Sequence, residues 1–217
     1  MAEASIGESE SAGRLLVTAA AAFWLGWLLM PGVGITDAAR ILGLVAGDRT
    51  GVVVSSVLHL VAAAALALAV PGLARWRPPD GNRFVSLAAS LLAVGACAVA
   101  ADAIFHFAAY EMAQPGADRE EMTAVLQRMQ SRDLPFVLPG VLSFFLGAGA
   151  LAGGASRARL VSRWNPRLHG LALATAGVGG PLLAPRGAGR AVGLVVLGLV
   201  SASLAWVGVA LARSRDA

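Results

Sequence analysis

Three ionisable side chains fall inside long apolar stretches of this sequence, and they are the residues with which chemistry could be done. They are His59, Asp102 and His106. Ionisable groups are costly to place in apolar helices, so those that occur there are candidates for a functional site. A buried aspartic acid can donate a proton, and a nearby imidazole can accept one near neutral pH. The three side chains therefore predict acid–base chemistry, with all three as catalytic candidates.

The spacing of these residues places them on defined helical faces. Asp102 and His106 are four residues apart, so they share one face of a helix, which Tyr110 continues a turn later. Ser55 and Ser56 lie one turn from His59 and are expected to orient its ring. The residues expected to bind a ligand beside the catalytic group are Tyr110, Ser55, Ser56, Trp24 and Trp27.

The composition indicates that a membrane surrounds the elements that position these residues. Of the 217 residues 57% are apolar and only 14% are charged, too few to cover the surface of a water-soluble domain. The net charge is +4, and all 17 basic residues are arginines that stand between apolar blocks. Nucleic-acid-binding proteins gather positive charge on one face, so we expect no nucleic-acid partner.

A spanning helix needs about 20 mostly apolar residues. Six segments of the chain approach that length, which predicts an all-α, polytopic membrane bundle of six transmembrane helices. The fifth segment is short, rich in glycine and interrupted by Pro181, so it is expected to be a broken or re-entrant helix. The six segments are 15–30, 52–74, 84–110, 134–154, 168–184 and 191–212.

The distribution of arginine predicts the orientation, because short cytoplasmic loops are enriched in positive charge. Arginines follow the second and fourth segments and occupy the tail, whereas the loops on the other side carry acidic residues as well. We therefore expect a cell-membrane protein with both termini in the cytoplasm. Residues 1–13 are expected to form a polar cytoplasmic segment, 14–212 the transmembrane domain and 213–217 a cytoplasmic tail.

The loop between the third and fourth segments predicts a short amphipathic helix on the outer side. Asp118 is a suitable N-cap, and Glu121 three residues later completes a capping-box pattern. Apolar residues then recur at the spacing of one helical face, at positions 122, 125, 126 and 129. Pro135 is expected to break this helix just before the fourth span. Such a helix would pack as a connector or close over the mouth of the bundle.

Counting residues from the span ends places the ionisable groups at a common depth. His59 and Asp102 each lie about eight residues below the outer end of antiparallel spans, which is on the order of 12 Å at 1.5 Å per residue. His106 lies about a turn nearer the outer surface. The sequence thus predicts an outer-half cavity, lined by His59, Asp102 and His106, that binds or converts a lipophilic small molecule.

Other functions remain open at this point. The same residues could form a hydrogen-bonded network with a purely structural role, or a relay in a small proton-coupled transporter that works as a homo-oligomer. Two histidines and a carboxylate also suit a transition metal. However, the motif has no established metal-ligand spacing across the two helices. Haem would need two histidines at matched depth, and His59 and His106 differ by about a turn, so we expect neither a metal nor a cofactor. Membrane lipid and a lipophilic small molecule are the expected partners.

Three further residues are interpreted as unrelated to this site. Cys97 stands alone in an apolar run and is expected to be a small core residue. His169 is expected at the cytoplasmic interface. Glu111 lies nine residues beyond Asp102, on the opposite side of the helix, and is expected to be solvated.

Two loose patterns resemble known membrane proteins. The run from Ser55 to Leu60, followed by Pro71-Gly72-Leu73 and an arginine-rich turn, resembles uncharacterised six-span membrane proteins of high-GC bacteria. The later run Ser162-Arg163-Trp164-Asn165-Pro166 resembles the same group. That resemblance implies a common membrane fold, with His59 and Asp102 as familiar features, and no established activity. In size and general character the chain is also similar to small membrane-bound terpene cyclases of bacteria. That resemblance implies isoprenoid cyclisation as an example of the expected chemistry.

Overall fold

The computed structural model describes residues 2–176 and 189–214, apart from the side chains of residues 2–8, 133, 134 and 136. The secondary structure of these residues is entirely helical, as predicted. Five of the helices contain an apolar stretch long enough to cross a membrane, so the chain is a multi-pass membrane protein. These five are α1 (Ala2–Leu29), α3 (Arg49–Arg75), α4 (Asn82–Met112), α5 (Arg119–Arg157) and α8 (Gly189–Arg213).

The fifth predicted span, 168–184, is only partly within the described residues. Helix α6 (Trp164–Ala174) covers its first part and is 11 residues long, too short to cross a membrane alone. Residues 177–184, including Pro181, lie outside the described residues. Within the part that is described, five spans are therefore shown and the sixth remains a prediction.

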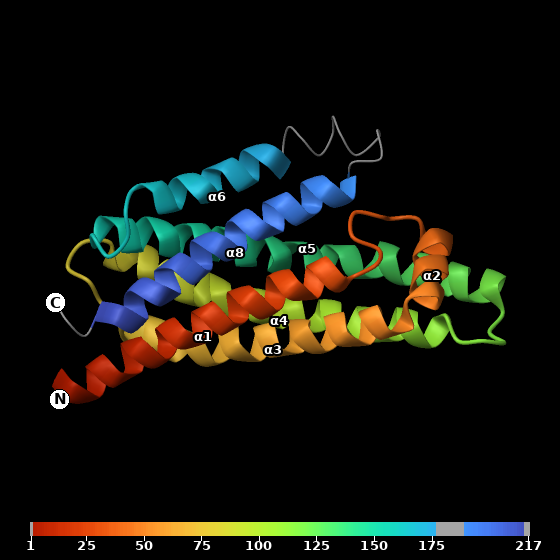
Figure 1. Cartoon of the computed structure of the whole chain (residues 1–217), viewed down its shortest axis with the longest axis horizontal. Helices are drawn as coiled ribbons and strands as arrows, with labels where there is room; N and C mark the ends of the chain where they lie inside the picture. Colours follow the sequence, from red (N-terminus) through yellow and green to blue (C-terminus); the bar gives the residue numbers. More distant parts are fainter. Residues whose placement is uncertain (1, 177–188, 215–217) are drawn as a thin grey trace.

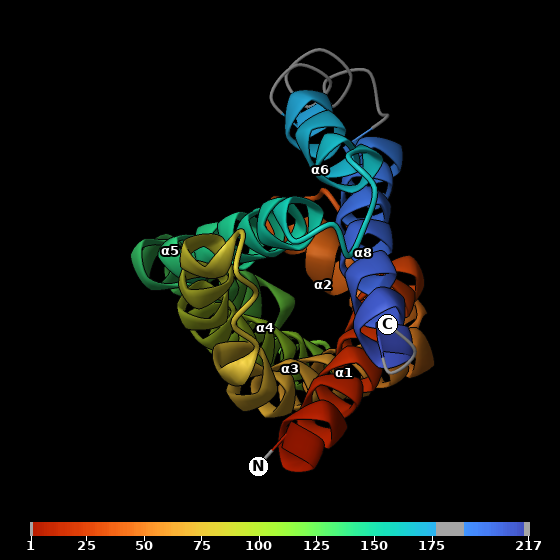
Figure 2. The same ribbon diagram turned by 90° about the vertical axis from the view of Figure 1, so that its left-hand side faces the viewer.

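The long helices pack in chain order around the bundle. Helix α1 packs on α3, α3 on α4 and α4 on α5, while α8 returns to α1. Figure 2 shows these helices as an arc, with α6 lying outside α8. The start of α1 and the end of α8 lie at one end of the bundle, opposite α2 (Ala38–Gly47) (Figure 1). We call these ends the termini end and the α2 end.

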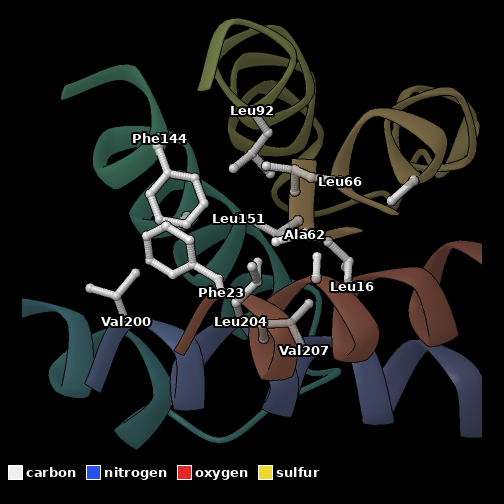
Figure 3. Close-up of a cluster of buried hydrophobic side chains, with 14 of the residues drawn as sticks. Leu16, Phe23, Ala62, Leu66, Leu92, Phe144, Leu151, Val200, Leu204 and Val207 are labelled. Carbon is white, nitrogen blue, oxygen red and sulfur yellow. The ribbon is translucent and has the colours of Figure 1, made fainter. Parts of the chain in front are cut away.

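Two apolar clusters hold the bundle together. The larger cluster fills the space between α1, α3, α4, α5 and α8, and many of its members are small (Figure 3). Within it the rings of Phe23 and Phe144 lie 4.8 Å apart. Small residues allow close approach where α1 crosses α8, since a methyl group on Gly13 would lie 2.5 Å from the carbonyl oxygen of Gly208. The smaller cluster lies at the α2 end and includes Met30, Leu42, Val52 and Leu126.

Helix α2 was not predicted from the sequence. Asp37 caps its start by accepting a hydrogen bond from the backbone N–H of Arg40 at 2.7 Å. Asp48 ends α2 and caps α3 by accepting from the backbone N–H of Gly51 at 2.9 Å. The two aspartates of this loop therefore stabilise helix N-termini, which favour negative charge.

The prediction for the loop before the fourth span was correct at its start and wrong at its end. Asp118 accepts hydrogen bonds from the backbone N–H groups of Glu120 and Glu121, as an N-cap does. The predicted break at Pro135 does not occur, because α5 runs without interruption through Pro135 and Pro139. Proline removes one backbone hydrogen bond, and in a packed membrane helix neighbouring groups compensate for that loss. The amphipathic segment and the fourth span are thus one helix of 39 residues.

Candidate functional site

His59 is fully buried in α3, and its ring lies against the backbone of α1. A methyl group on Gly26 would lie 3.0–3.1 Å from three ring atoms of His59, so any larger residue there would require the imidazole to move. The ring also meets Trp27 edge-on, with centroids 4.8 Å apart, and Phe23 at 5.8 Å. Helix α1 therefore forms the wall that positions His59.

Ser55, one turn before His59, links this ring to α1. Its hydroxyl donates a hydrogen bond to the carbonyl oxygen of Gly26 at 2.8 Å and lies 3.4 Å from Nδ1 of His59. A serine hydroxyl carries a single proton, which Gly26 accepts, so in its contact with His59 the oxygen can only accept. This assigns the proton to Nδ1 and leaves the lone pair of Nε2 unprotonated.

Asp102 and His106 come to the same place from α4. Nδ1 of His106 lies 3.8 Å from a carboxylate oxygen of Asp102, and the rings of His59 and His106 are 5.8 Å apart. One nitrogen from each histidine and one oxygen of Asp102 all lie within 4.8 Å of one another. The sequence-based expectation that His59 and Asp102 share a depth is consistent with this geometry.

His106 lies closer to His59 than its position along the chain suggested. Side chains of a helix lean toward its N-terminus, and α3 and α4 run in opposite directions. His59 therefore leans toward the α2 end, whereas His106 leans away from it. Because the two side chains tilt toward each other, their separation along the bundle is smaller than the turn or so that the residue count implied.

Several polar atoms of this cluster lack a hydrogen-bond partner among the described residues. These atoms are Nε2 of His59, Nδ1 of His106 and the indole nitrogen of Trp27. Buried polar groups are nearly always paired, and exceptions point to a functional role or to a bound ligand, ion or water. These atoms are therefore available to a ligand, an ion or water.

A pocket of about 330 Å³ adjoins the cluster at the α2 end of the bundle. Asp102 and His106 are the ionisable residues in its described wall, and Thr36 and Gln130 add two uncharged polar groups. The rest of the wall is mainly apolar, from Trp27, Met30, Ile35, Ile41, Val45, Val52, Phe105 and Ala109. Small-molecule sites typically have this size and this combination of apolar wall and few polar groups.

The pocket wall combines segments that are far apart in the sequence. The turn after α1 contributes Met30 and Ile35, α2 contributes Ile41 and Val45, and α5 contributes Gln130. The side-chain amide of Gln130 donates a hydrogen bond to the carbonyl oxygen of Thr36 at 3.3 Å. The amphipathic part of α5 is thus joined to the turn after α1 beside the pocket.

The expected ligand-binding residues are not all brought together. Trp27 and Ser55 contact the histidines, as described above. Ser56 is buried but donates to the carbonyl oxygen of Val52 in its own helix. The ring of Tyr110 is covered by the guanidinium group of Arg49 at 4.0 Å. The indole of Trp24 faces α8, where a methyl group on Gly198 would lie 2.9 Å from its nitrogen.

Sequence reasoning missed Gly26, Phe105 and Gln130. Gly26 offered one signal, its position beside Trp27 in an apolar span. Phe105 precedes His106 and lines the pocket, with the two ring centroids 6.2 Å apart. No sequence pattern pointed to Gln130, because its role depends on how α5 meets the turn after α1.

The three residues interpreted as unrelated to the site differ in burial. His169 is only 5% exposed, and a methyl group on Gly149 would lie 2.8 Å from its ring, so it is buried between α6 and α5. Its place at the cytoplasmic interface stays a prediction. Cys97 is exposed rather than part of the core, and it lines a groove between α3 and α4. Glu111 is exposed, as expected.

Comparisons with known proteins add no family to these observations. No protein-family model matches the chain, and neither a curated protein nor a solved structure matches it.

Proposed function

We propose that this protein binds a small lipophilic molecule in the pocket at the α2 end and converts it by acid–base chemistry. The observation that carries the proposal is the pocket of about 330 Å³, whose mainly apolar wall places Asp102 and His106 side by side. An apolar wall selects a lipophilic molecule, and the two ionisable groups would contact its one polar or reactive part.

The chemistry needs no oxidant or reductant. Asp102 in its acid form would donate a proton to a carbon–carbon double bond of the substrate, and His106 would accept a proton from a neighbouring carbon. The net result is an isomerised or cyclised product, and transfer of the proton from His106 back to Asp102, 3.8 Å away, would restore both groups. An isoprenoid is a substrate class with the required double bonds and apolar character. Trp27 would contribute an aromatic face toward the cationic carbon formed between the two steps.

We also infer that the termini end faces the cytoplasm. The turn between α3 and α4 and the turn between α5 and α6 both lie at that end and are rich in arginine. This distribution is typical of cytoplasmic loops. The pocket would then lie in the outer half of the membrane, where a lipophilic substrate dissolved in the bilayer has access to it.

Thermal unfolding of the purified protein in detergent, with geraniol, farnesol or 1-decanol added, tests the binding part of the proposal. We expect at least one of these compounds to raise the melting temperature of the unaltered protein, because a ligand that binds the folded state stabilises it. Ala109→Phe fills the pocket and should abolish the shift. Ala101→Phe, on the exposed side of α4, is the matched control and should retain it.

Gas chromatography of the two isoprenoid alcohols after incubation tests the chemical part. Isomerised or cyclised product should form with the unaltered protein and be lost in Asp102→Asn. If no compound shifts the melting temperature, or if the Ala109→Phe variant responds as the Ala101→Phe variant does, the pocket is not a binding site for lipophilic molecules.

A further inference from the structure

We infer that His59, Asp102 and His106 together bind a divalent transition-metal ion. The inference goes beyond the proposed function, because it concerns what holds the three side chains together rather than what enters the pocket. It can be tested without any organic ligand.

The donor set is the first support for this site. Two imidazoles and one carboxylate bind zinc and related first-row metals, and three protein ligands with one open position are typical of catalytic zinc sites. Here one ligand atom from each residue lies within 4.8 Å of the other two. Tetrahedral metal bonds of about 2.0–2.2 Å place ligand atoms roughly 3.3–3.6 Å apart. Side-chain rotations that bring the most distant atoms about 1.5 Å closer would therefore complete the site.

The state of His59 is the second support. Its ring is fully buried, its Nδ1 is occupied by Ser55, and its Nε2 has no partner among the described residues. Histidines that bind metals commonly donate their other N–H to an oxygen, which fixes the tautomer and directs the free nitrogen toward the ion. Ser55, held by the carbonyl of Gly26, supplies that oxygen.

The charge of the cluster is the third support. Within the described part of the chain, the recorded ion-pair contact of Asp102 is with His106, and no arginine pairs with it. A carboxylate inside a membrane needs a compensating positive charge or a proton. A divalent cation would supply that charge and would also pair Nε2 of His59 and Nδ1 of His106, two of the unpartnered atoms.

The open coordination position would face the pocket, because Asp102 and His106 line its wall. With the ion bound, Asp102 and His106 are ligands and no longer donate or accept the proton of the substrate themselves. The ion supplies Lewis acidity and makes a bound water more acidic, and that water would take over the acid–base roles. The pocket would favour a lipophilic molecule with an oxygen atom at one end, since such an atom can occupy the open position.

Metal binding is tested on the full-length protein purified in detergent, with any affinity tag removed and metals stripped by EDTA. The protein is then equilibrated with Zn²⁺ at micromolar free concentration, and bound zinc is counted by mass spectrometry. Co²⁺ serves as a spectroscopic probe, because four-coordinate cobalt absorbs strongly in the visible range. We expect one ion per chain and loss of binding in His59→Gln, Asp102→Asn and His106→Gln.

Two further variants keep the test decisive if a ligand variant fails to fold. His169→Gln removes a buried histidine outside the cluster and should bind zinc as the unaltered protein does. Ser55→Ala keeps all three ligands and removes the oxygen behind His59, so zinc affinity should fall by about 10–100-fold. An unaltered protein that binds no zinc, or binding that survives in all three ligand variants, would overturn the inference.

The failures of the two proposals are distinguishable. Zinc binding without any melting shift from the lipophilic compounds would leave the metal site standing and remove the proposed function. If those compounds raise the melting temperature of EDTA-treated protein that binds no zinc, the proposed function stands and the metal site is removed.

Discussion

The imidazole of His59 packs directly against the backbone of Gly26, where a methyl group would lie 3.0–3.1 Å from Cε1, Nδ1 and Nε2 of the ring. The carbonyl oxygen of Gly26 also accepts a hydrogen bond from the Ser55 hydroxyl at 2.8 Å. One residue of α1 thus provides both the space for the histidine and the acceptor that fixes its tautomer. The candidate site depends on this contact between α1 and α3 as much as on its ionisable residues.

Substitution of Gly26 should disrupt the site. Gly26→Leu cannot be accommodated without moving the His59 ring, so we expect a loss of about 1–3 kcal/mol in stability and a loss of ligand and zinc binding. Gly43→Leu is the control, because no described atom lies within 4 Å of a methyl group at Gly43. Thermal unfolding and zinc counting compare the two. If the Gly26→Leu and Gly43→Leu variants have equal melting temperatures and bind equally, the His59 ring does not pack against Gly26.

Asp102→Asn separates a functional role from a structural one. Asp102 has no hydrogen bond among the described residues, and its carboxylate is 3.8 Å from His106, too far for one. Replacing it by a neutral amide of the same shape should therefore leave the melting temperature within a few degrees of the original while product formation and zinc binding disappear.

Glu111→Gln, an exposed carboxylate on the same helix, is the matched control for Asp102→Asn and should change neither property. A large drop in melting temperature for Asp102→Asn alone would favour a structural network. Uptake of the lipophilic compounds into proteoliposomes that depends on a pH gradient would instead favour proton-coupled transport, the other function that the sequence leaves open.

A buried polar pair should hold α6 against α8. The side-chain amide of Asn165 donates to the carbonyl oxygen of Ser203 at 3.0 Å, and the Ser203 hydroxyl donates to Oδ1 of Asn165 at 3.1 Å. Asn165→Ala leaves both Ser203 groups without this partner, and we expect it to cost about 1–3 kcal/mol in stability. Thr175→Ala, which affects an exposed hydroxyl on α6, should cost far less.

A double-mutant cycle measured by thermal unfolding tests whether Asn165 and Ser203 act together. The pair Asn165→Ala and Ser203→Ala should show a coupling of about 0.5–3 kcal/mol. Strictly additive effects would show that α6 is not held at α8 by this pair.

Cysteine labelling tests the orientation. In a Cys97→Ser background, Thr36→Cys introduces a thiol at an exposed position of the α2 end, and Ser162→Cys introduces one at an exposed position of the termini end. A membrane-impermeant maleimide added to intact cells should label only Thr36→Cys, and both should react after lysis. Labelling of Ser162→Cys in intact cells would show that the termini end faces the outside, opposite to the inferred orientation.

The long helices and the ionisable residues were predictable because they depend on local properties. Apolar runs of about 20 residues predict spans wherever they occur, and five of the predicted spans coincide with long described helices. Asp118 was predictable as a cap because capping acts over three residues. The break at Pro135 was predicted by the same local reasoning and is wrong, since the packing of a helix can outweigh the bond that a proline removes.

The sequence by itself determined a helical membrane protein with His59 and Asp102 near one depth and His106 about a turn away, because hydropathy and helical spacing are read along the chain. Only the tertiary structure decided that these side chains converge within 4.8 Å, that Gly26 makes room for His59, and that Trp27 joins the group whereas Trp24 and Tyr110 do not. The physical reason is that convergence depends on the direction in which side chains lean and on which helix faces meet. Those are set by packing between segments that are distant in the sequence.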